Sequence, residues 1–365
     1  MRIGKNTFEA FLEQSKGKRV VAFAASDFLQ LISQNYPELM LEKKIDYIID
    51  NDLSKHGKTI CINNEIKMIY SIEKIKAEIC QDIIILISSD VFVYEIYNQL
   101  EEIEELKNIE CFALSLLVAK HSDYMNEGVK TGDKISIPKK IHCFWFSNDE
   151  KTDLAQKCIE SWKKYCPDYE IIEWNAGNYD VRKNKYMSKA YDEKNWAYVS
   201  DYARLDVLYM HGGVYLDLDV ELLKSMDVLL HHDFFIGFGP IRDIEAAAFG
   251  ARPGCELLLE MMDIYTKKEF DPVAGTNLLN VQPVYLDYFF DSKGFNINGE
   301  YQENKGIAIY PREIFSPKNW FTGENEIKDC SIGIHHCVGG WTSEKSKKRK
   351  MIKYTGNKLM EQIVI

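Results

Sequence analysis

The chain has 365 residues, of which 46% are hydrophobic, and a formal net charge of −11 at pH 7. This length and apolar content predict two domains with sizeable cores. The excess of acidic residues excludes a nucleic-acid-binding surface, because neutralising phosphates needs clustered lysine and arginine. Nine cysteines without a Cys-x-x-Cys pair indicate neither a disulfide framework nor a zinc site, which favours a reducing, cytoplasmic location.

The first 130 residues have the pattern of a small Rossmann-like α/β domain. Amphipathic segments at residues 27–36 and 91–106 alternate with short apolar runs, which is typical of βαβ units. Because the runs are continuous and rich in β-branched residues, we expect buried parallel strands there. These runs cover residues 19–24, 45–50 and 82–87.

The loop after the first of these strands lacks the dinucleotide fingerprint. That fingerprint needs Gly-x-Gly-x-x-Gly, since the backbone must approach a pyrophosphate closely. Residues 22–27 read Ala-Phe-Ala-Ala-Ser-Asp, although Asp50 follows the second strand near the place of a ribose-binding acid. We therefore predict a degenerate nucleotide loop and a docking or structural role. An NAD-dependent sugar-modifying enzyme is an alternative.

A linker is expected at residues 126–134, where glycine and charged residues interrupt the periodic segments. It separates a first domain, residues 1–130, from a second domain, residues 135–365.

The most informative stretch of the second domain is residues 200–220, which predicts a helix, a Gly-Gly turn and a strand. Residues two apart in a strand point to the same side, so Asp217 and Asp219 should converge. Such paired oxygen ligands suit Mg²⁺ or Mn²⁺ bridging a diphosphate. Asp201 and Arg204 share a helix face. In isolation, an Asp-x-Asp is more often a solvated turn, and Asp201 with Arg204 a surface ion pair.

Residues 200–220 resemble the sugar-binding region of family 32 glycosyltransferases, which include bacterial capsule and lipopolysaccharide transferases and are related to the clostridial glucosylating toxins. Residues 137–146, IPKKIHCFWF, resemble the first strand of such a catalytic domain. Residues 334–341, IHHCVGGW, are similar to the closing His-His…Ser-Trp motif, with Gly340 in place of the serine. The resemblance implies a GT-A fold for the second domain.

The same resemblance implies a retaining hexosyltransferase that depends on Mn²⁺ or Mg²⁺. Its donor would be a UDP-sugar, UDP-galactose or UDP-glucose, and its acceptor a growing bacterial surface polysaccharide or a lipid-linked oligosaccharide. It assigns catalysis to Asp201, Arg204, Asp217 and Asp219, nucleotide-sugar binding to Trp145, Tyr215, Asp217 and Trp341, and metal binding to Asp217, Asp219 and His336.

A non-catalytic subunit that binds sugar nucleotides or glycans within a polysaccharide-assembly complex is the second alternative. Two departures from the family pattern leave it open, namely Gly340 and the alanine-rich residues 246–248.

Membrane contact is expected to be peripheral. Residues 1–6 lack the apolar core of a signal peptide, and no apolar run reaches the ~20 residues that span a bilayer. A basic residue near anionic lipid contributes ~1 kcal/mol, so a basic C-terminal segment predicts contact with the inner membrane face. A solvated helix face is the alternative. The basic residues are Lys345, Lys347, Lys348, Arg349, Lys350 and Lys353.

Overall fold

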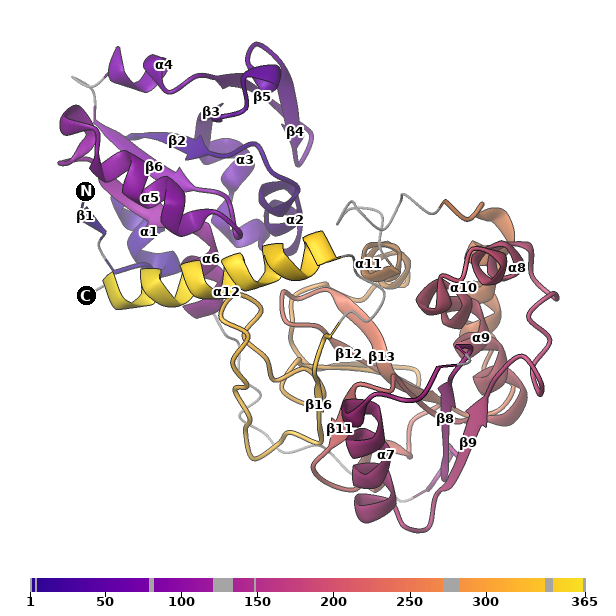
Figure 1. Cartoon of the computed structure of the whole chain (residues 1–365). Coiled ribbons are helices and arrows are strands. Elements are labelled where there is room, and N and C mark those ends of the chain that lie inside the picture. The colour runs from indigo at the N-terminus through magenta and orange to yellow at the C-terminus, as the bar shows by residue number, and fades with distance from the viewer. Residues whose placement is uncertain are drawn as a thin grey trace. The chain divides into compact units, whose positions relative to one another are not determined.

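The computed structural model divides the chain into two compact units (Figure 1). It describes residues 2–3, 5–78, 82–120, 134–147, 149–271, 282–338 and 344–363. The first unit consists of Met1–Ser122, Asn319–Glu324 and Thr342–Ile365, and the second of Asp123–Lys318 and Asn325–Trp341.

Two segments that we expected in the second domain therefore group with the first unit, namely residues 319–324 and 342–365. Residues 126–133 of the expected linker lie outside the described residues. The α/β class is confirmed, because parallel strands and helices build both units.

The sheet of the first unit is parallel except at one edge, where β4 and β5 are antiparallel. All three strands predicted from apolar runs form, as β2, β3 and β6, and they lie side by side in the sheet. The strand order is β1 (Arg2–Ile3), β7 (Glu110–Ala113), β6 (Ile83–Ile87), β2 (Arg19–Phe23), β3 (Ile45–Ile49), β5 (Glu65–Tyr70) and β4 (Thr59–Ile62).

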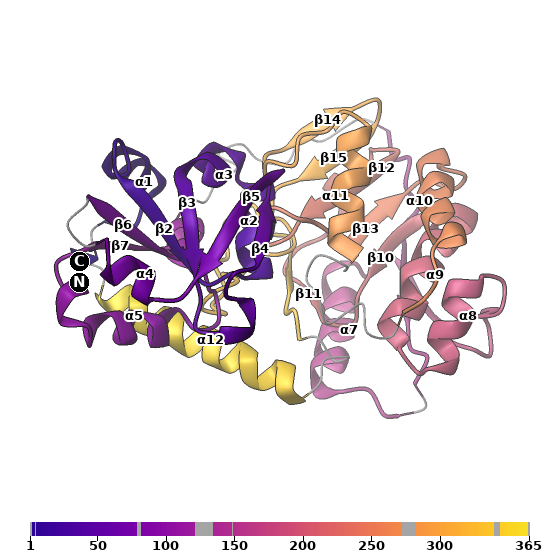
Figure 2. The same cartoon turned by 90° about the horizontal axis from the view of Figure 1, so that it is seen from above.

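Helices cover both faces of this sheet. Figure 2 shows α5 and α12 on one face and α1 and α3 on the other. Apolar residues of α5 and α12 join one buried cluster with β2, β3 and β6. The described helices of the unit are α1 (Phe8–Gln14), α2 (Asp27–Asn35), α3 (Leu41–Lys44), α4 (Glu73–Lys76), α5 (Val93–Glu101), α6 (Leu114–Lys120) and α12 (Glu344–Ile363).

Protein groups already bind the carboxylate of Asp50, which we considered as a ribose-binding acid. The backbone N–H of Ala25 donates to Oδ2 at 2.8 Å, and the Lys55 ammonium lies 3.0 Å from the same oxygen. The N–H of Asp52 donates to Oδ1 at 2.8 Å. Both oxygens of Asp50 are thus engaged by protein groups, and the degenerate nucleotide loop stays a prediction.

Lys353 does not belong to an exposed basic segment as predicted. It is buried within the first unit, where its ammonium lies 3.8 Å from the ring centroid of Trp320 and 3.9 Å from the Asp90 carboxylate. Lys353 is nine residues along α12 from Glu344. Among the other basic residues of this segment, Lys345, Lys347, Lys348 and Arg349 are exposed, as predicted. None of the described helices is both long and apolar enough to cross a bilayer.

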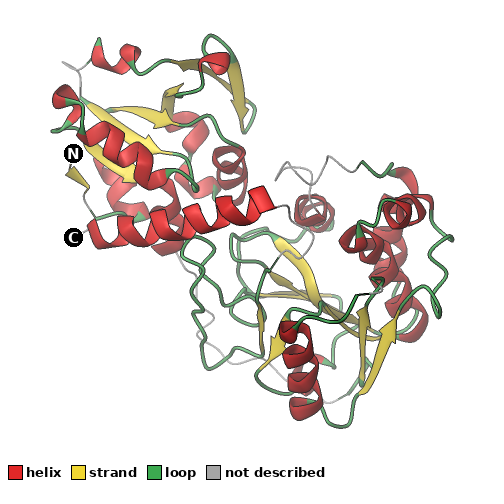
Figure 3. Ribbon diagram, viewed as in Figure 1, coloured by secondary structure: helices red, strands yellow, loops and turns green. Residues whose placement is uncertain are grey.

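The second unit contains a mixed seven-stranded sheet and a two-stranded sheet (Figure 3). The strand order of the large sheet is β14 (Gln302–Asn304), β15 (Ile307–Tyr310), β12 (Phe234–Phe238), β13 (Ile244–Ala251), β10 (Gly213–Leu216), β8 (Lys140–Phe144) and β9 (Glu170–Trp174). The small sheet pairs β11 (Val220–Leu222) with β16 (Gly333–His335), antiparallel. The described helices are α7 (Asp153–Tyr165), α8 (Lys185–Asp192), α9 (Trp196–His211), α10 (Glu256–Lys267) and α11 (Gln282–Ser292).

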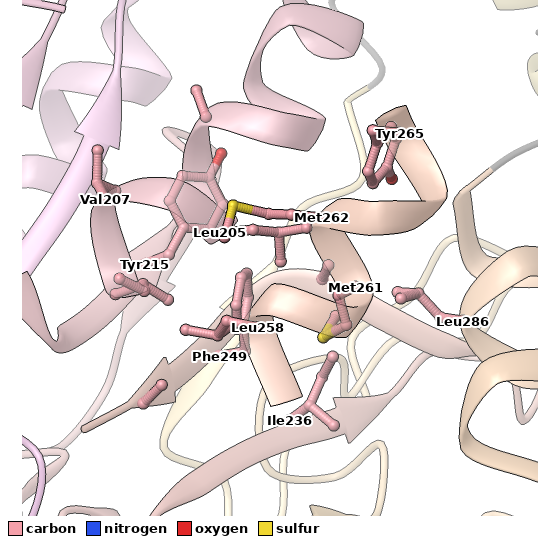
Figure 4. Packing of buried hydrophobic residues seen from close by; sticks show 14 of the residues in the cluster. Leu205, Val207, Tyr215, Ile236, Phe249, Leu258, Met261, Met262, Tyr265 and Leu286 are labelled. Carbon is pink, nitrogen blue, oxygen red and sulfur yellow. The ribbon is translucent and has the colours of Figure 1, made fainter. Parts of the chain in front are cut away.

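Helix α9 is buried along most of its length. Its apolar residues pack with α10, β10, β12 and β13, as Figure 4 shows for Leu205, Tyr215, Phe249 and Met261. Because α9 precedes β10 directly, this packing fixes the direction in which β10 begins.

Candidate active site

Two glycines set the turn from α9 into β10. Gly212 and Gly213 have φ values of +61° and +117°, which side chains disfavour. A Cβ on Gly212 would lie 2.5 Å from Pro253 Cδ, and one on Gly213 would lie 2.9 Å from the backbone oxygen of Lys140. The close approach to Lys140 lets β10 pair in parallel with β8, so that both strands end at the same edge of the sheet.

Asp217 and Asp219 lie in a turn between β10 and β11, and not within a strand as predicted. Strand β10 ends at Leu216, and the N–H of Val220 donates to the Asp217 carbonyl at 3.0 Å. The turn still brings the two side chains together. Their carboxylate oxygens and a ring nitrogen of His335 all lie within 4.8 Å of one another.

Asp217 is held by two neighbours that the sequence assigned to the site. The hydroxyl of Tyr215 donates to Oδ1, and Nη1 of Arg204 lies 3.9 Å from the same oxygen. Burial raises the pKa of Asp217, while the charge of Arg204 acts in the opposite direction. Tyr215 is itself buried, so its hydroxyl serves to orient Asp217.

Asp219 is the more acidic member of the pair. Burial opposes its ionisation, but His335 and the N–H of Val338 hold the pKa of Asp219 below its ordinary value. The ring Nε2 of His335 lies 3.4 Å from Oδ1, and Val338 donates to Oδ2 at 2.9 Å. Asp219 is therefore ionised at neutral pH and able to act as a ligand for a cation.

The Asp201–Arg204 pair is buried, which contradicts the alternative of a surface ion pair. Nη2 of Arg204 lies 3.3 Å from Asp201, and only 5% and 10% of the two side chains are exposed. Nη1 donates to the Ala246 carbonyl at 2.7 Å, and Nε to the Ser200 carbonyl at 2.9 Å. Burial raises the pKa of Asp201 to about 6, against the effect of the guanidinium. Arg204 thus ties α9 to β13 and to both carboxylates.

His335, and not His336, lies beside the aspartates. Consecutive residues of an extended segment point to opposite sides. The ring of His336 therefore contacts Glu221, with Nε2 2.9 Å from its carboxylate, while the ring of His335 faces Asp219. The ring of His335 thus takes the place beside the aspartates that we expected for His336, and a metal-binding role for either histidine stays a prediction.

Glu245 of β13 completes the cluster, and the sequence reasoning missed it. Its Oε1 lies 2.8 Å from Nδ1 of His335, and the Ser316 hydroxyl donates to Oε2. Burial opposes ionisation of Glu245, but His335 lowers its pKa. One feature of the sequence could have pointed to Glu245. It is an acidic residue within an otherwise apolar strand of eight residues.

Trp145 follows β8 directly, at the same sheet edge as Asp217. It is half-buried, and its Nε1 donates to the Asp149 carbonyl at 2.9 Å. Trp341 and Gly340 lie outside the described residues.

The residues present fit a divalent cation. Burial opposes protonation of His335, yet the surrounding Cys337, Glu245 and Asp219 raise its pKa well above the usual value. The groups around the ring therefore favour a positive charge there, and a cation would have to displace the ring proton from Nε2 to bind. Carboxylate oxygens are ligands that Mg²⁺ and Mn²⁺ prefer, and the imidazole beside them favours a transition-metal ion over Mg²⁺.

Residues 152–236 match the family described as "Glycosyltransferase sugar-binding region containing DXD motif". The matched residues include Asp201, Arg204, Tyr215, Asp217 and Asp219.

Two curated relatives are mannosyltransferases by name, both from Schizosaccharomyces pombe. The chain is 31% identical over 154 residues to inositol phosphoceramide mannosyltransferase 3, which covers 39% of this chain and 41% of that protein. It is 29% identical over 212 residues to inositol phosphoceramide mannosyltransferase 1, covering 54% and 63%. The chain thus matches less than two thirds of the length of either relative.

Two solved glycosyltransferases are also similar, at low identity. "PaToxG Glycosyltransferase" is 19% identical with a TM-score of 0.32, covering 44% of this chain and 75% of that one. A glycosyltransferase involved in the glycosylation of the major capsid of PBCV-1 is 11% identical with a TM-score of 0.33, covering 58% and 98%.

Proposed function

We propose that this chain is a metal-dependent glycosyltransferase of the GT-A type that moves a hexose from a nucleoside-diphosphate donor with retention. The observation that carries the proposal is the convergence of Asp217, Asp219 and His335 within 4.8 Å, next to a matched sugar-binding region.

A divalent cation held by Asp219, Asp217 and His335 would supply Lewis-acid stabilisation of the charge that develops on the leaving diphosphate. The protein's own groups prepare this site. Glu245 fixes the ring of His335 through Nδ1, so that Nε2 faces the aspartates. Tyr215 orients Asp217.

Arg204 acts as a positioning residue for both Asp201 and Asp217. Its donors go to protein oxygens on α9 and β13, and its charge balances the two buried carboxylates. Asp201, held in this way, is the residue we assign to the sugar hydroxyls, while Trp145 is assigned to stacking on the base of the donor.

The transfer breaks the bond between the anomeric carbon and the diphosphate oxygen. In the same-face mechanism that we propose, an acceptor oxygen forms its bond on the face from which the diphosphate leaves, through an oxocarbenium-like state. The acceptor proton passes to the leaving diphosphate. We assign no residue as a covalent nucleophile, and the anomeric configuration of the product tests this step.

UDP-galactose and UDP-glucose are the donors implied by the resemblance, and the names of the two relatives add mannose. For the acceptor we propose a bacterial surface-glycan intermediate or a lipid-linked oligosaccharide. The exposed basic residues at the start of α12 support a peripheral contact with anionic lipid.

The test is donor hydrolysis across a panel of UDP- and GDP-hexoses with Mn²⁺ or EDTA. The wild type is compared with the double variant Asp217→Ala/Asp219→Ala, and with Asp263→Ala, an exposed residue of α10, as the control. Release of one nucleotide that needs metal and is lost only in the double variant supports the proposal. Metal-dependent donor binding without turnover, even with acceptor glycans, favours the non-catalytic binding subunit. No binding of any donor contradicts our assignment of the site.

A further inference from the structure

His335 presents its two ring nitrogens to two different groups of side chains. Nε2 faces Asp219 at 3.4 Å. Nδ1 lies 2.8 Å from Oε1 of Glu245 and 3.4 Å from Sγ of Cys337. The ligand atoms of Glu245, His335 and Cys337 all lie within 4.8 Å of one another.

The spacing of this second group suits a tetrahedral cation. Bonds of about 2.0–2.3 Å place neighbouring ligand atoms roughly 3.3–3.6 Å apart. The distance of 3.4 Å between Nδ1 and Sγ matches this value, and a small rotation of Glu245 would lengthen its 2.8 Å contact. Cys337 has a φ of +50°, a conformation uncommon outside glycine, and its thiol turns back over His335.

The chemistry of the two groups differs. Asp217 and Asp219 offer hard oxygen atoms, whereas Cys337 adds a soft sulfur beside an imidazole and a carboxylate. We infer that Glu245, His335 and Cys337 form a second metal site, for a thiophilic divalent cation, Zn²⁺ above all. Local sequence spacing hides this site, because Glu245 stands 90 residues before His335.

The two sites share one imidazole and therefore compete. When Zn²⁺ binds Nδ1 and the Cys337 thiolate, the thiol proton and the proton on Nδ1 leave to solvent, and one ring proton remains on Nε2. His335 then has no lone pair to offer beside Asp219. Zinc should consequently inhibit the transferase. This inhibition rests on the proposed function, whereas the binding of zinc is independent of it.

Binding is tested with Co²⁺ alone as a spectroscopic probe, because a thiolate ligand gives cobalt a charge-transfer absorption in the near ultraviolet. We expect this band in the wild type and in Cys330→Ser, a control at another half-buried cysteine. We expect it to be lost in Cys337→Ser. A band that is absent from the wild type, or that survives in Cys337→Ser, overturns the inference.

The unsubstituted protein gives a second measurement. Zn²⁺ should protect Cys337, but not Cys330, from alkylation by iodoacetamide, as read by peptide mass spectrometry. Equal alkylation of Cys337 with and without Zn²⁺ would overturn the inference. This measurement needs no variant, so it does not depend on whether a substituted protein folds.

Competition is tested by inhibiting Mn²⁺-dependent donor hydrolysis with Zn²⁺. In Cys337→Ser the zinc concentration for half inhibition, measured against the variant's own rate without zinc, should rise at least about tenfold. If the zinc concentration for half inhibition is the same in Cys337→Ser and in the wild type, zinc acts at the Asp217–Asp219 pair and the inference fails. If no preparation turns over, the proposed function fails, and the cobalt absorption still decides the second site.

Discussion

Asp219 is where the proposed chemistry depends most on a single side chain. It is the aspartate whose pKa is lowered, and it contacts both His335 and Val338. Asp219→Asn keeps the shape but removes the charge, so we expect the rate of donor hydrolysis to fall about 10²–10³-fold. The rate with saturating Mn²⁺ is the measurement, with Asp263→Asn as the matched exposed control. Activity within about threefold of the wild type would rule out a metal role for Asp219.

Ala24 at the end of β2 carries backbone strain. Its φ is +102°, although its N–H and carbonyl are both bonded, to the Ile49 carbonyl and the Ser88 hydroxyl. A glycine fits this conformation, so Ala24→Gly should stabilise the protein by about 1 kcal/mol. Urea unfolding measures this change. Ala25→Gly, whose φ is not positive, is the control and should destabilise. A lower unfolding midpoint for Ala24→Gly would contradict the assigned strain.

At the scale of elements, α11 contacts β13 through Asp287, an aspartate with a raised pKa. Burial and the neighbouring Asp243 raise the pKa of Asp287 to about 8, and its Oδ1 accepts the N–H of Ile244 at 2.7 Å. The folded state therefore binds this proton more tightly than the unfolded state, whose aspartate titrates near 4. Stability should fall as the pH rises from about 4 to about 8, where the unfolded chain has released the proton.

Asp287→Asn should flatten this decline, since asparagine keeps the acceptor without the charge. The unfolding midpoint in urea near pH 5 and near pH 8 measures it. Asp291→Asn, exposed on the same helix, should leave the decline unchanged. An identical pH dependence in wild type and Asp287→Asn would show that this carboxyl is ionised in the folded protein.

The turn between α9 and β10 sets the distance between two sheet strands. A Cβ on Gly213 would meet Lys140, whereas one on Gly254, also at positive φ, meets nothing within 4 Å. Gly254→Ala should therefore lower stability only through the backbone strain of a positive φ, by about 1–3 kcal/mol. Gly213→Ala should lower the thermal midpoint further than Gly254→Ala and should also reduce donor hydrolysis by shifting Asp217. If Gly213→Ala and Gly254→Ala change the thermal midpoint and the rate of donor hydrolysis equally, the close approach of Gly213 to Lys140 does not matter for the site.

The first turns of α12 expose Lys345, Lys347, Lys348 and Arg349. At ~1 kcal/mol for each basic residue, replacing all four with glutamine should weaken binding to phosphatidylserine vesicles at least about tenfold. Vesicle sedimentation measures this, with pure phosphatidylcholine vesicles as the control. Binding that is equal on both lipids, or unaffected by the substitutions, supports the solvated helix face.

At the scale of the whole molecule, local patterns and distant pairings differ in how far they can be read from the sequence. The strands β2, β3 and β6 and the pairing of Asp201 with Arg204 follow from apolar runs and helical spacing, which are local properties. The choice of His335 over His336 depends on β16 pairing with β11, about 115 residues earlier in the chain. Glu245 enters through β13, and no spacing rule connects these segments.

The sequence also did not predict that α12 belongs to the first unit. The basic residues at the beginning of α12 can be read from the sequence, but the helices against which it packs cannot. Lys353 was read as one charge among six. Its position over Trp320, in the inserted segment Asn319–Glu324, could only come from the fold.

The composition of the first unit has a consequence for the order in which the protein is made. Met360 is fully buried in the same apolar cluster as Ile96 and Leu100, so the cluster needs residues from both ends of the chain. A domain at the start of a chain normally folds while the rest is still being translated. Here the cluster of the first unit is completed only once α12 has been synthesised, so one side of its core stays uncovered while the second unit is made.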